Sequence, residues 1–71
     1  MKLYTQNVCP KCMLAKMWIQ QSGKEVEYIN LDEHEELREV LRSKGLSSLP
    51  VLEVDGEFIT DQNEIQQVFL G

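Results

Sequence analysis

Two strand patterns flank one helix pattern near the start of this 71-residue chain, and that order restricts the fold. Lys2–Thr5 carries an aromatic and a β-branched residue, and Glu25–Leu31 begins by alternating acidic with apolar side chains, as strands do. Residues 10–22 repeat apolar side chains at helical spacing, with Pro10 suited to the first helical position and Gly23 to the C-terminal end. Strand, helix and strand predict a parallel, right-handed βαβ unit.

Apolar residues recur at three- and four-residue spacing along this helix. They are Met13, Leu14, Met17 and Trp18. We expect Met17 in the core and Trp18 in the core or at its edge, because both lie on one stripe with a leucine. Met13 follows the turn that holds the cysteines, so core packing and partner contact remain open for it.

Two later segments place an aspartate three residues before a glutamate, a spacing that resembles a capping box. They are Asp32 with Glu35 and Asp61 with Glu64, and Gly45 can end the first of the two helices. Each is followed by an apolar stripe, formed by Leu37, Val40 and Leu41 in one case and by Ile65, Val68 and Phe69 in the other. Two further helices are therefore predicted.

Asp55-Gly56 separates two apolar segments, 50–54 and 57–60, and this dipeptide is a strong signal for a β-hairpin. The predicted order is βαβαββα, an α/β arrangement. Without a linker, repeat or low-complexity segment, and at this length, the chain is predicted to form a single domain over 1–71.

Charge and hydropathy exclude several classes of function. The formal charge of −5, from 12 acidic and 7 basic residues, disfavours binding to nucleic acid or to anionic membranes. The N-terminal residues lack the apolar segment of a signal peptide, and no stretch is long enough to span a bilayer. We therefore expect a soluble, monomeric protein of the cytoplasm.

Cys9-Pro10-Lys11-Cys12 carries the chemistry. Two cysteines are too few for a secreted disulfide scaffold, so a reactive pair is the better interpretation. Cys9 falls at or near the helix N-cap, where backbone amides and the helix dipole stabilise a thiolate, and Lys11 adds positive charge. We expect Cys9 to attack a substrate disulfide and Cys12 to resolve the mixed disulfide.

The alternative for this pair is a structural or zinc-binding role. Zinc would need two further ligands, and His34 is the only histidine. Because His34 lies among acidic residues at a predicted helix start, we expect it at the surface, and no metal site is predicted.

These residues resemble the glutaredoxin family along nearly the whole chain. The matching segments are Tyr4-Thr5, Cys9-Pro10-Lys11-Cys12, Ala15-Lys16 and Ser48-Leu49-Pro50, together with the hairpin and the last helix. The resemblance implies a thioredoxin-like fold, with a four-stranded mixed sheet flanked by three helices. It also implies a cis Leu49-Pro50 peptide facing the cysteines, with the Leu49 backbone free to pair with a substrate.

The family resemblance further implies that glutathione recharges the protein and that no cofactor is permanently bound. Pro10, Lys11, Leu49, Pro50, Thr60 and Asp61 are then the substrate-binding candidates. The sequence departs from the family at Lys11, where tyrosine is common, at Gln6, where lysine is common, and at Thr60-Asp61, where a Gly-Gly and acidic segment holds glutathione.

Two alternatives follow from the resemblance. The chain also resembles the redoxin that serves ribonucleotide reductase, through Tyr4-Thr5 and Leu49-Pro50, and such a protein is recharged by thioredoxin reductase. Some glutaredoxins instead hold an iron-sulfur cluster between two subunits, through the residue equivalent to Cys9 and glutathione thiols. Protein disulfides, glutathione and ribonucleotide reductase are thus the candidate partners.

Overall fold

A computed structural model describes all residues 1–71 and has the element order βαβαββα that the sequence predicts. The elements are β1 Lys2–Thr5, α1 Pro10–Ser22, β2 Glu27–Asn30, α2 Glu35–Ser43, β3 Val51–Val54, β4 Glu57–Ile59 and α3 Gln62–Leu70. The strands form one sheet in the order β2-β1-β3-β4, with β1 parallel to β2 and antiparallel to β3. None of the helices is long and apolar enough to cross a membrane.

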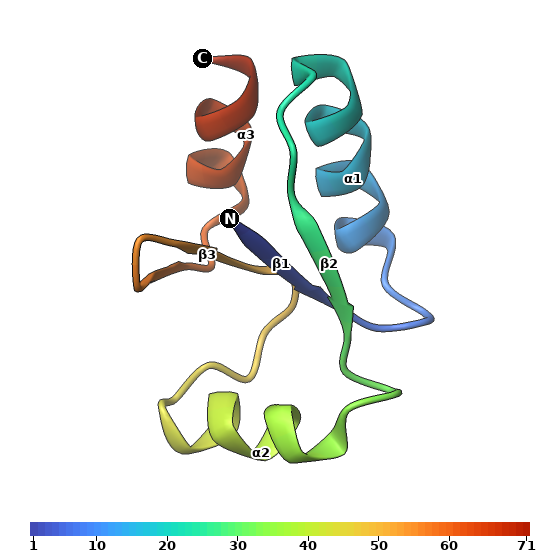
Figure 1. Ribbon diagram of the computed structural model, residues 1–71, viewed down its shortest axis with the longest axis vertical. Coiled ribbons are helices and arrows are strands. Elements are labelled where there is room, and N and C mark those ends of the chain that lie inside the picture. Colours follow the sequence, from blue (N-terminus) through green and yellow to red (C-terminus); the bar gives the residue numbers. More distant parts are fainter.

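The sheet separates two hydrophobic clusters. In Figure 1, α1 and α3 lie beside each other on one side of the strands and α2 lies on the other. Successive residues of a strand point to opposite faces, so Leu3 packs toward α1 and α3 while Tyr4 packs toward α2. The first cluster contains Leu3, Ala15, Ile19, Leu52, Ile65 and Phe69, and the second contains Tyr4, Leu31, Leu41 and Val51. The thioredoxin-like arrangement is confirmed.

The hairpin forms as predicted. Asp55 and Gly56 have φ of 50° and 82°, so both central residues are left-handed, which is the type I′ geometry that joins twisted strands. Gly45 ends the second helix through hydrogen bonds from its own N–H to the Arg42 carbonyl and from the Leu46 N–H to the Leu41 carbonyl.

The face of α1 that packs inward differs from the predicted one. Met17 is 52% exposed, so its predicted place in the core is wrong, and Met13 is also exposed. The buried residues are instead Cys12, Ala15 and Ile19. The small side chains at 12 and 15 let the helix approach the sheet and α3 closely, which turns the methionines outward. Trp18 packs at the edge of the first cluster, as expected.

The region around β2 and α2 also differs in part. The strand predicted over Glu25–Leu31 is limited to Glu27–Asn30, because β1 offers only four residues to pair with it. The predicted cap at Asp32 is wrong, since α2 begins after His34, whose side chain makes no capping bond. Val40, predicted within the apolar stripe, is 48% exposed. His34 is exposed, as predicted.

Candidate functional site

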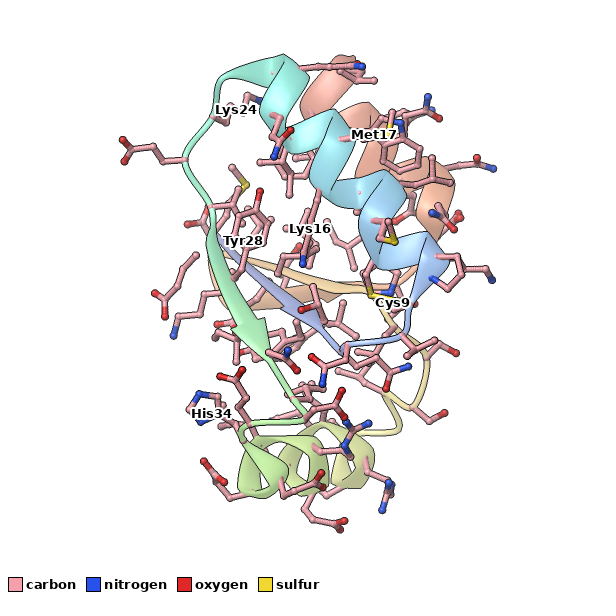
Figure 2. All side chains as sticks on the ribbon, turned by 90° about the vertical axis from the view of Figure 1, so that its right-hand side faces the viewer. Cys9, Lys16, Met17, Lys24, Tyr28 and His34 are labelled. Carbon is pink, nitrogen blue, oxygen red and sulfur yellow. A yellow bond between two sulfur atoms is a disulfide. The ribbon has the colours of Figure 1, made fainter.

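The two cysteines meet at the start of α1. After β1 ends at Thr5, a short loop brings Cys9 to the N-cap with an extended backbone, φ −153° and ψ 91°. Cys9 and Cys12 form a disulfide, with their Cα atoms 5.2 Å apart. Figure 2 shows the Cys9 sulfur at the end of α1. Cys9 is 7% exposed and Cys12 is 1% exposed, so Cys9 is the more accessible of the two.

The two sulfurs differ in their hydrogen bonding at the start of the helix. The backbone N–H of Cys12 donates a hydrogen bond to Cys9 Sγ over 3.1 Å, which makes this sulfur the acceptor at the helix N-terminus. The same donor and the positive end of the helix dipole favour a negative charge on that sulfur after reduction. Pro10 occupies the first helical position and is exposed, while Cys12 is enclosed in the first turn.

A polar network that the sequence analysis missed holds the loop before Cys9. The Asn7 N–H donates to Asp32 Oδ2 over 2.7 Å, and Arg38 binds Asp32 Oδ1 over 2.8 Å. Arg38 also donates to Gln6 Oε1 over 3.3 Å, and the Asn30 amide donates to Asn7 Oδ1 over 2.6 Å. The loop is thereby tied to the end of β2 and to α2. The sequence signal that could have revealed this network is Asp32, an aspartate directly after the predicted strand.

Leu49-Pro50 lies at the same end of the sheet as the cysteines. Its peptide bond is cis. Pro50 is buried and directly precedes β3, whose Val51 pairs with Tyr4 near the end of β1. Leu49 packs against the cluster beneath α2. Both residues are thus placed beside the strand end from which the loop leads to Cys9.

The start of α3 lies against the first turn of α1. Gln62 Nε2 donates to the Lys11 carbonyl oxygen over 3.3 Å, a contact absent from the sequence prediction. Asp61 caps α3 as predicted, since its Oδ1 accepts the Asn63 N–H over 3.1 Å. Thr60 and the Lys11 side chain are exposed. The structure therefore places Thr60 and Asp61, which directly precede α3, near the first turn of α1 that contains Lys11.

Tyr4 belongs to the interior rather than to the thiol site. Its hydroxyl donates to Glu53 Oε1 over 2.6 Å, and its ring packs under α2. Burial, and then this hydrogen bond to a carboxylate, raise the pKa of Tyr4 from 10.0 to about 12. Tyr4 therefore stays neutral and keeps its donor through the physiological range.

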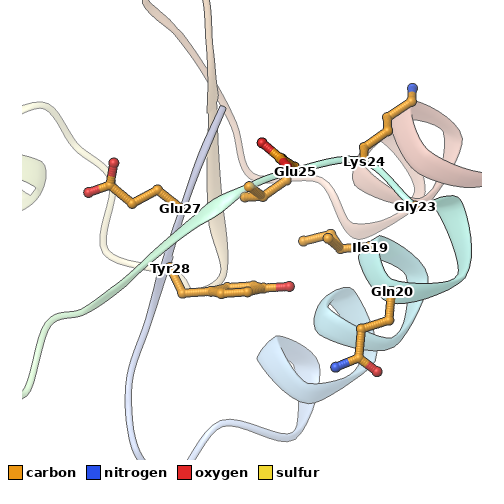
Figure 3. Close-up of a pocket in the computed structure, with 8 residues that line it drawn as sticks. Ile19, Gln20, Gly23, Lys24, Glu25, Glu27 and Tyr28 are labelled. Atoms are coloured by element: carbon orange, nitrogen blue, oxygen red, sulfur yellow. The ribbon is translucent and has the colours of Figure 1, made fainter.

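The largest pocket lies elsewhere. It has a volume of about 610 Å³ and opens between the C-terminal half of α1 and β2, with Ile19, Gln20 and Tyr28 among its lining residues (Figure 3). No group of three or more histidine, cysteine, aspartate or glutamate side chains is gathered as a metal site would require.

A disulfide between a helix N-cap and the first turn, set beside a cis proline on a four-stranded mixed sheet, defines a dithiol protein of the thioredoxin-like fold. The glutaredoxin family model matches residues 1–59. The chain belongs to the glutaredoxin family.

Individual relatives sharpen this assignment. The glutaredoxin-like protein NrdH of Escherichia coli K12 is 38% identical over 50 residues, which cover 70% of this chain and 62% of NrdH, and NrdH of Shigella flexneri matches equally well. The chain therefore matches less than two thirds of the length of these relatives. The solved structure of E. coli NrdH-redoxin superposes with a TM-score of 0.84 at 29% identity, covering 94% of this chain and 91% of that one. That redoxin is described as glutaredoxin-like with a thioredoxin-like activity profile.

Proposed function

We propose that this chain is a thiol-disulfide oxidoreductase that reduces protein disulfides and is recharged by a thioredoxin reductase. The observation that carries the proposal is the Cys9–Cys12 disulfide at the helix N-cap, with Cys9 as the accessible sulfur and as acceptor of the Cys12 amide. Reduction of this disulfide generates the two thiols that the reaction needs.

The reaction follows from the asymmetry of the pair. The Cys9 thiolate attacks one sulfur of the substrate disulfide, forms a mixed disulfide and releases the other substrate sulfur as a thiolate. Cys12 then loses its proton and attacks Cys9 Sγ, which releases the second substrate sulfur. The substrate gains two electrons and the protein returns to the disulfide state. Leu49 is available to pair with the substrate backbone, which would place the substrate disulfide at Cys9.

The start of α3 supports a reductase over glutathione as the electron donor. The family holds glutathione here with a Gly-Gly and acidic segment, whereas this chain has Thr60 before Asp61. The missing glycines weaken the case for glutathione at this place. The similarity to a redoxin with a thioredoxin-like activity profile supports the same choice over the glutathione hypothesis.

The partner that accepts the electrons is proposed on the same ground. The resemblance to the redoxin of ribonucleotide reductase, and the NrdH relatives, favour ribonucleotide reductase as the protein whose disulfide is reduced. A cytoplasmic location would suit this role, because structural disulfides are rare there and a dithiol donor stays reduced.

The test compares two electron donors on the oxidised protein. One sample receives reduced glutathione, and the other receives NADPH with thioredoxin reductase. Thiol counting and the fluorescence of Trp18, which lies on α1 and packs at the edge of the core, follow the reaction. We expect rapid reduction in the reductase sample only. Rapid reduction by glutathione alone would overturn the proposed donor.

Two variants test the catalytic pair itself. Cys9→Ser should abolish reduction of a protein disulfide, and Cys12→Ser should accumulate a mixed disulfide with the substrate. The matched control is Ser47→Ala, at an exposed serine outside the site. Exchange activity retained by Cys9→Ser would exclude the mechanism.

A further inference from the structure

Lys16 lies on the same side of α1 as the two cysteines. Seven residues make almost two helical turns, so Lys16 follows Cys9 on one face, and it lies one turn beyond Cys12. Side chains of a helix lean toward its N-terminus, which directs the Lys16 ammonium back toward the thiols. In Figure 2, Lys16 lies between Tyr28 and Cys9.

Tyr28 holds this ammonium without neutralising it. Lys16 Nζ is 5.5 Å from the centroid of the Tyr28 ring, which projects from β2. Lys16 is partly buried and takes part in none of the ion pairs of the structure. A cation over an aromatic face keeps its full charge and is restrained in position. A positive charge is thus kept beside α1 with no carboxylate to compensate it.

We propose that the Lys16 ammonium stabilises the Cys9 thiolate of the reduced protein through space, and that Tyr28 is the positioning residue that holds this ammonium. The inference rests on the proposed redox function and extends it to residues outside the Cys-Pro-Lys-Cys motif. The cation that the sequence places next to the thiols, Lys11, has an exposed side chain in solvent, where water and salt screen its charge.

The other charged groups near the site do not offer the same contribution. Asp32, from the end of β2, is paired with Arg38 of α2, so these two charges largely cancel. Asp61, at the start of α3, is bound to an amide of its own helix. At the far end of α1, Lys24 donates to the Val68 carbonyl, roughly 20 Å from Cys9 along the helix axis.

The experiment measures how fast iodoacetamide alkylates Cys9 as a function of pH. A Cys12→Ser background leaves one thiol, and its rate follows the thiolate fraction. Lys16→Met removes the charge but keeps an unbranched stem against the sheet. We expect the midpoint of the pH profile to rise by about 0.5 unit, about threefold in the ionisation constant, as one charge about 10 Å away, seven residues along the helix, would produce near a protein surface.

Three further variants separate charge from packing. Lys16→Arg should keep the parent profile, and Lys24→Met, which removes the same charge beyond the screening length, should also leave it unchanged. Tyr28→Leu should shift the midpoint in the same direction as Lys16→Met but by less, because the ammonium stays on the helix and loses its restraint. High salt should reduce the Lys16→Met shift.

Coincident profiles for Lys16→Met and the parent would overturn the inference, as would an equal shift in Lys24→Met. This outcome is distinguishable from failure of the proposed function. The alkylation profile reports on the Cys9 thiolate even in a protein that reduces no disulfide, whereas the electron-donor assay reports on turnover.

Discussion

The N-terminal ends of α2 and α3 follow the same sequence pattern and are built differently. Asp61 caps α3 directly by accepting the Asn63 N–H. Asp32, which has the same spacing to a glutamate, instead binds the Asn7 N–H and the Arg38 guanidinium, and the cap position passes to His34, which makes no side-chain capping bond. Asp61 therefore stabilises its own helix, whereas Asp32 stabilises the loop that precedes Cys9.

The difference shows which interactions win when one carboxylate has several possible donors. A capping bond contributes about 1 kcal/mol, whereas hydrogen bonds to charged groups contribute up to about 1.5–3 kcal/mol each. Asp32 reaches a guanidinium and a loop amide with its two oxygens, so leaving the helix end uncapped costs less than losing both. No comparable donor competes for the Asp61 carboxylate, which accepts only the capping bond.

The largest effect should come from Asp32. Asp32→Ala removes the partner of Arg38 and the acceptor of the Asn7 N–H, so we expect the free energy of unfolding to fall by about 2 kcal/mol. The loop before Cys9 should also become looser, and disulfide reduction should slow. Urea denaturation followed by Trp18 fluorescence measures the first effect, and the protein-disulfide assay measures the second.

Arg38→Met supplies the control for this prediction. If Asp32 acts through Arg38, the double variant should lose clearly less stability than the sum of the two single losses, because both remove the same interaction. Additive losses would show that Asp32 acts through another contact. Additive losses would also contradict our interpretation that the bond between Asp32 and Arg38 stabilises the protein more than a helix cap would.

Glu53 adds a third carboxylate to the comparison, one whose partner is a neutral hydroxyl. Tyr4→Phe should lower the free energy of unfolding by about 1.5 kcal/mol at neutral pH. The pKa of Tyr4 is about 12 in the folded protein against 10.0 ordinarily, so folding favours the protonated form. This contribution is fully present below pH 10 and is lost as the pH rises through 12.

Absorbance of tyrosinate in a Tyr28→Phe background isolates the titration of Tyr4. We expect a midpoint near 12, and the loss of stability at high pH should be smaller in Tyr4→Phe than in the parent. A midpoint at the ordinary value of 10.0 would contradict the role given to burial and to Glu53.

Asp61 should have a smaller effect than Asp32. Asp61→Ala removes one capping bond at an exposed helix end and should cost about 1 kcal/mol, while Asp61→Asn should keep most of it. Urea denaturation of the two variants gives both values. A loss in Asp61→Ala as large as in Asp32→Ala would mean that the two helix ends are equivalent after all.

Local patterns were enough to predict most of the fold. The positive φ at Asp55 and Gly56 and the cap at Asp61 follow from residues adjacent in sequence, and the parallel pairing of β1 with β2 follows from the strand-helix-strand order. The inward face of α1 was predicted wrongly, because hydrophobicity alone does not distinguish Met17 from the smaller Ala15. How closely a helix can approach a sheet depends on the opposing surface, which the sequence of one helix does not contain.

The functional site is likewise divided into features that short motifs predict and contacts that arise only in the folded chain. Cys9, Cys12 and the cis proline were predictable from short motifs and the family resemblance. The bond of Asp32 to Asn7 joins residues 25 positions apart, and its bond to Arg38 depends on how α2 is placed after β2, so an aspartate after a strand does not identify its partners. Lys16 was part of a matching motif, but its relation to Tyr28 appears only when α1 lies over β2.

The smallest effect should appear at His34, where a substitution can give α2 the side-chain cap that α3 already has. Because this N-cap residue is exposed and its side chain makes no capping bond, His34→Asp should add the bond that Asp61 makes at α3 and raise the free energy of unfolding by about 0.5 kcal/mol. The added charge also favours the positive end of the helix, although Glu35 and Glu36 already lie there and limit the gain. Urea denaturation should show the gain, and disulfide reduction should be unchanged. A loss of stability would mean that crowding of acidic groups at α2, rather than an unfilled cap, governs this helix end.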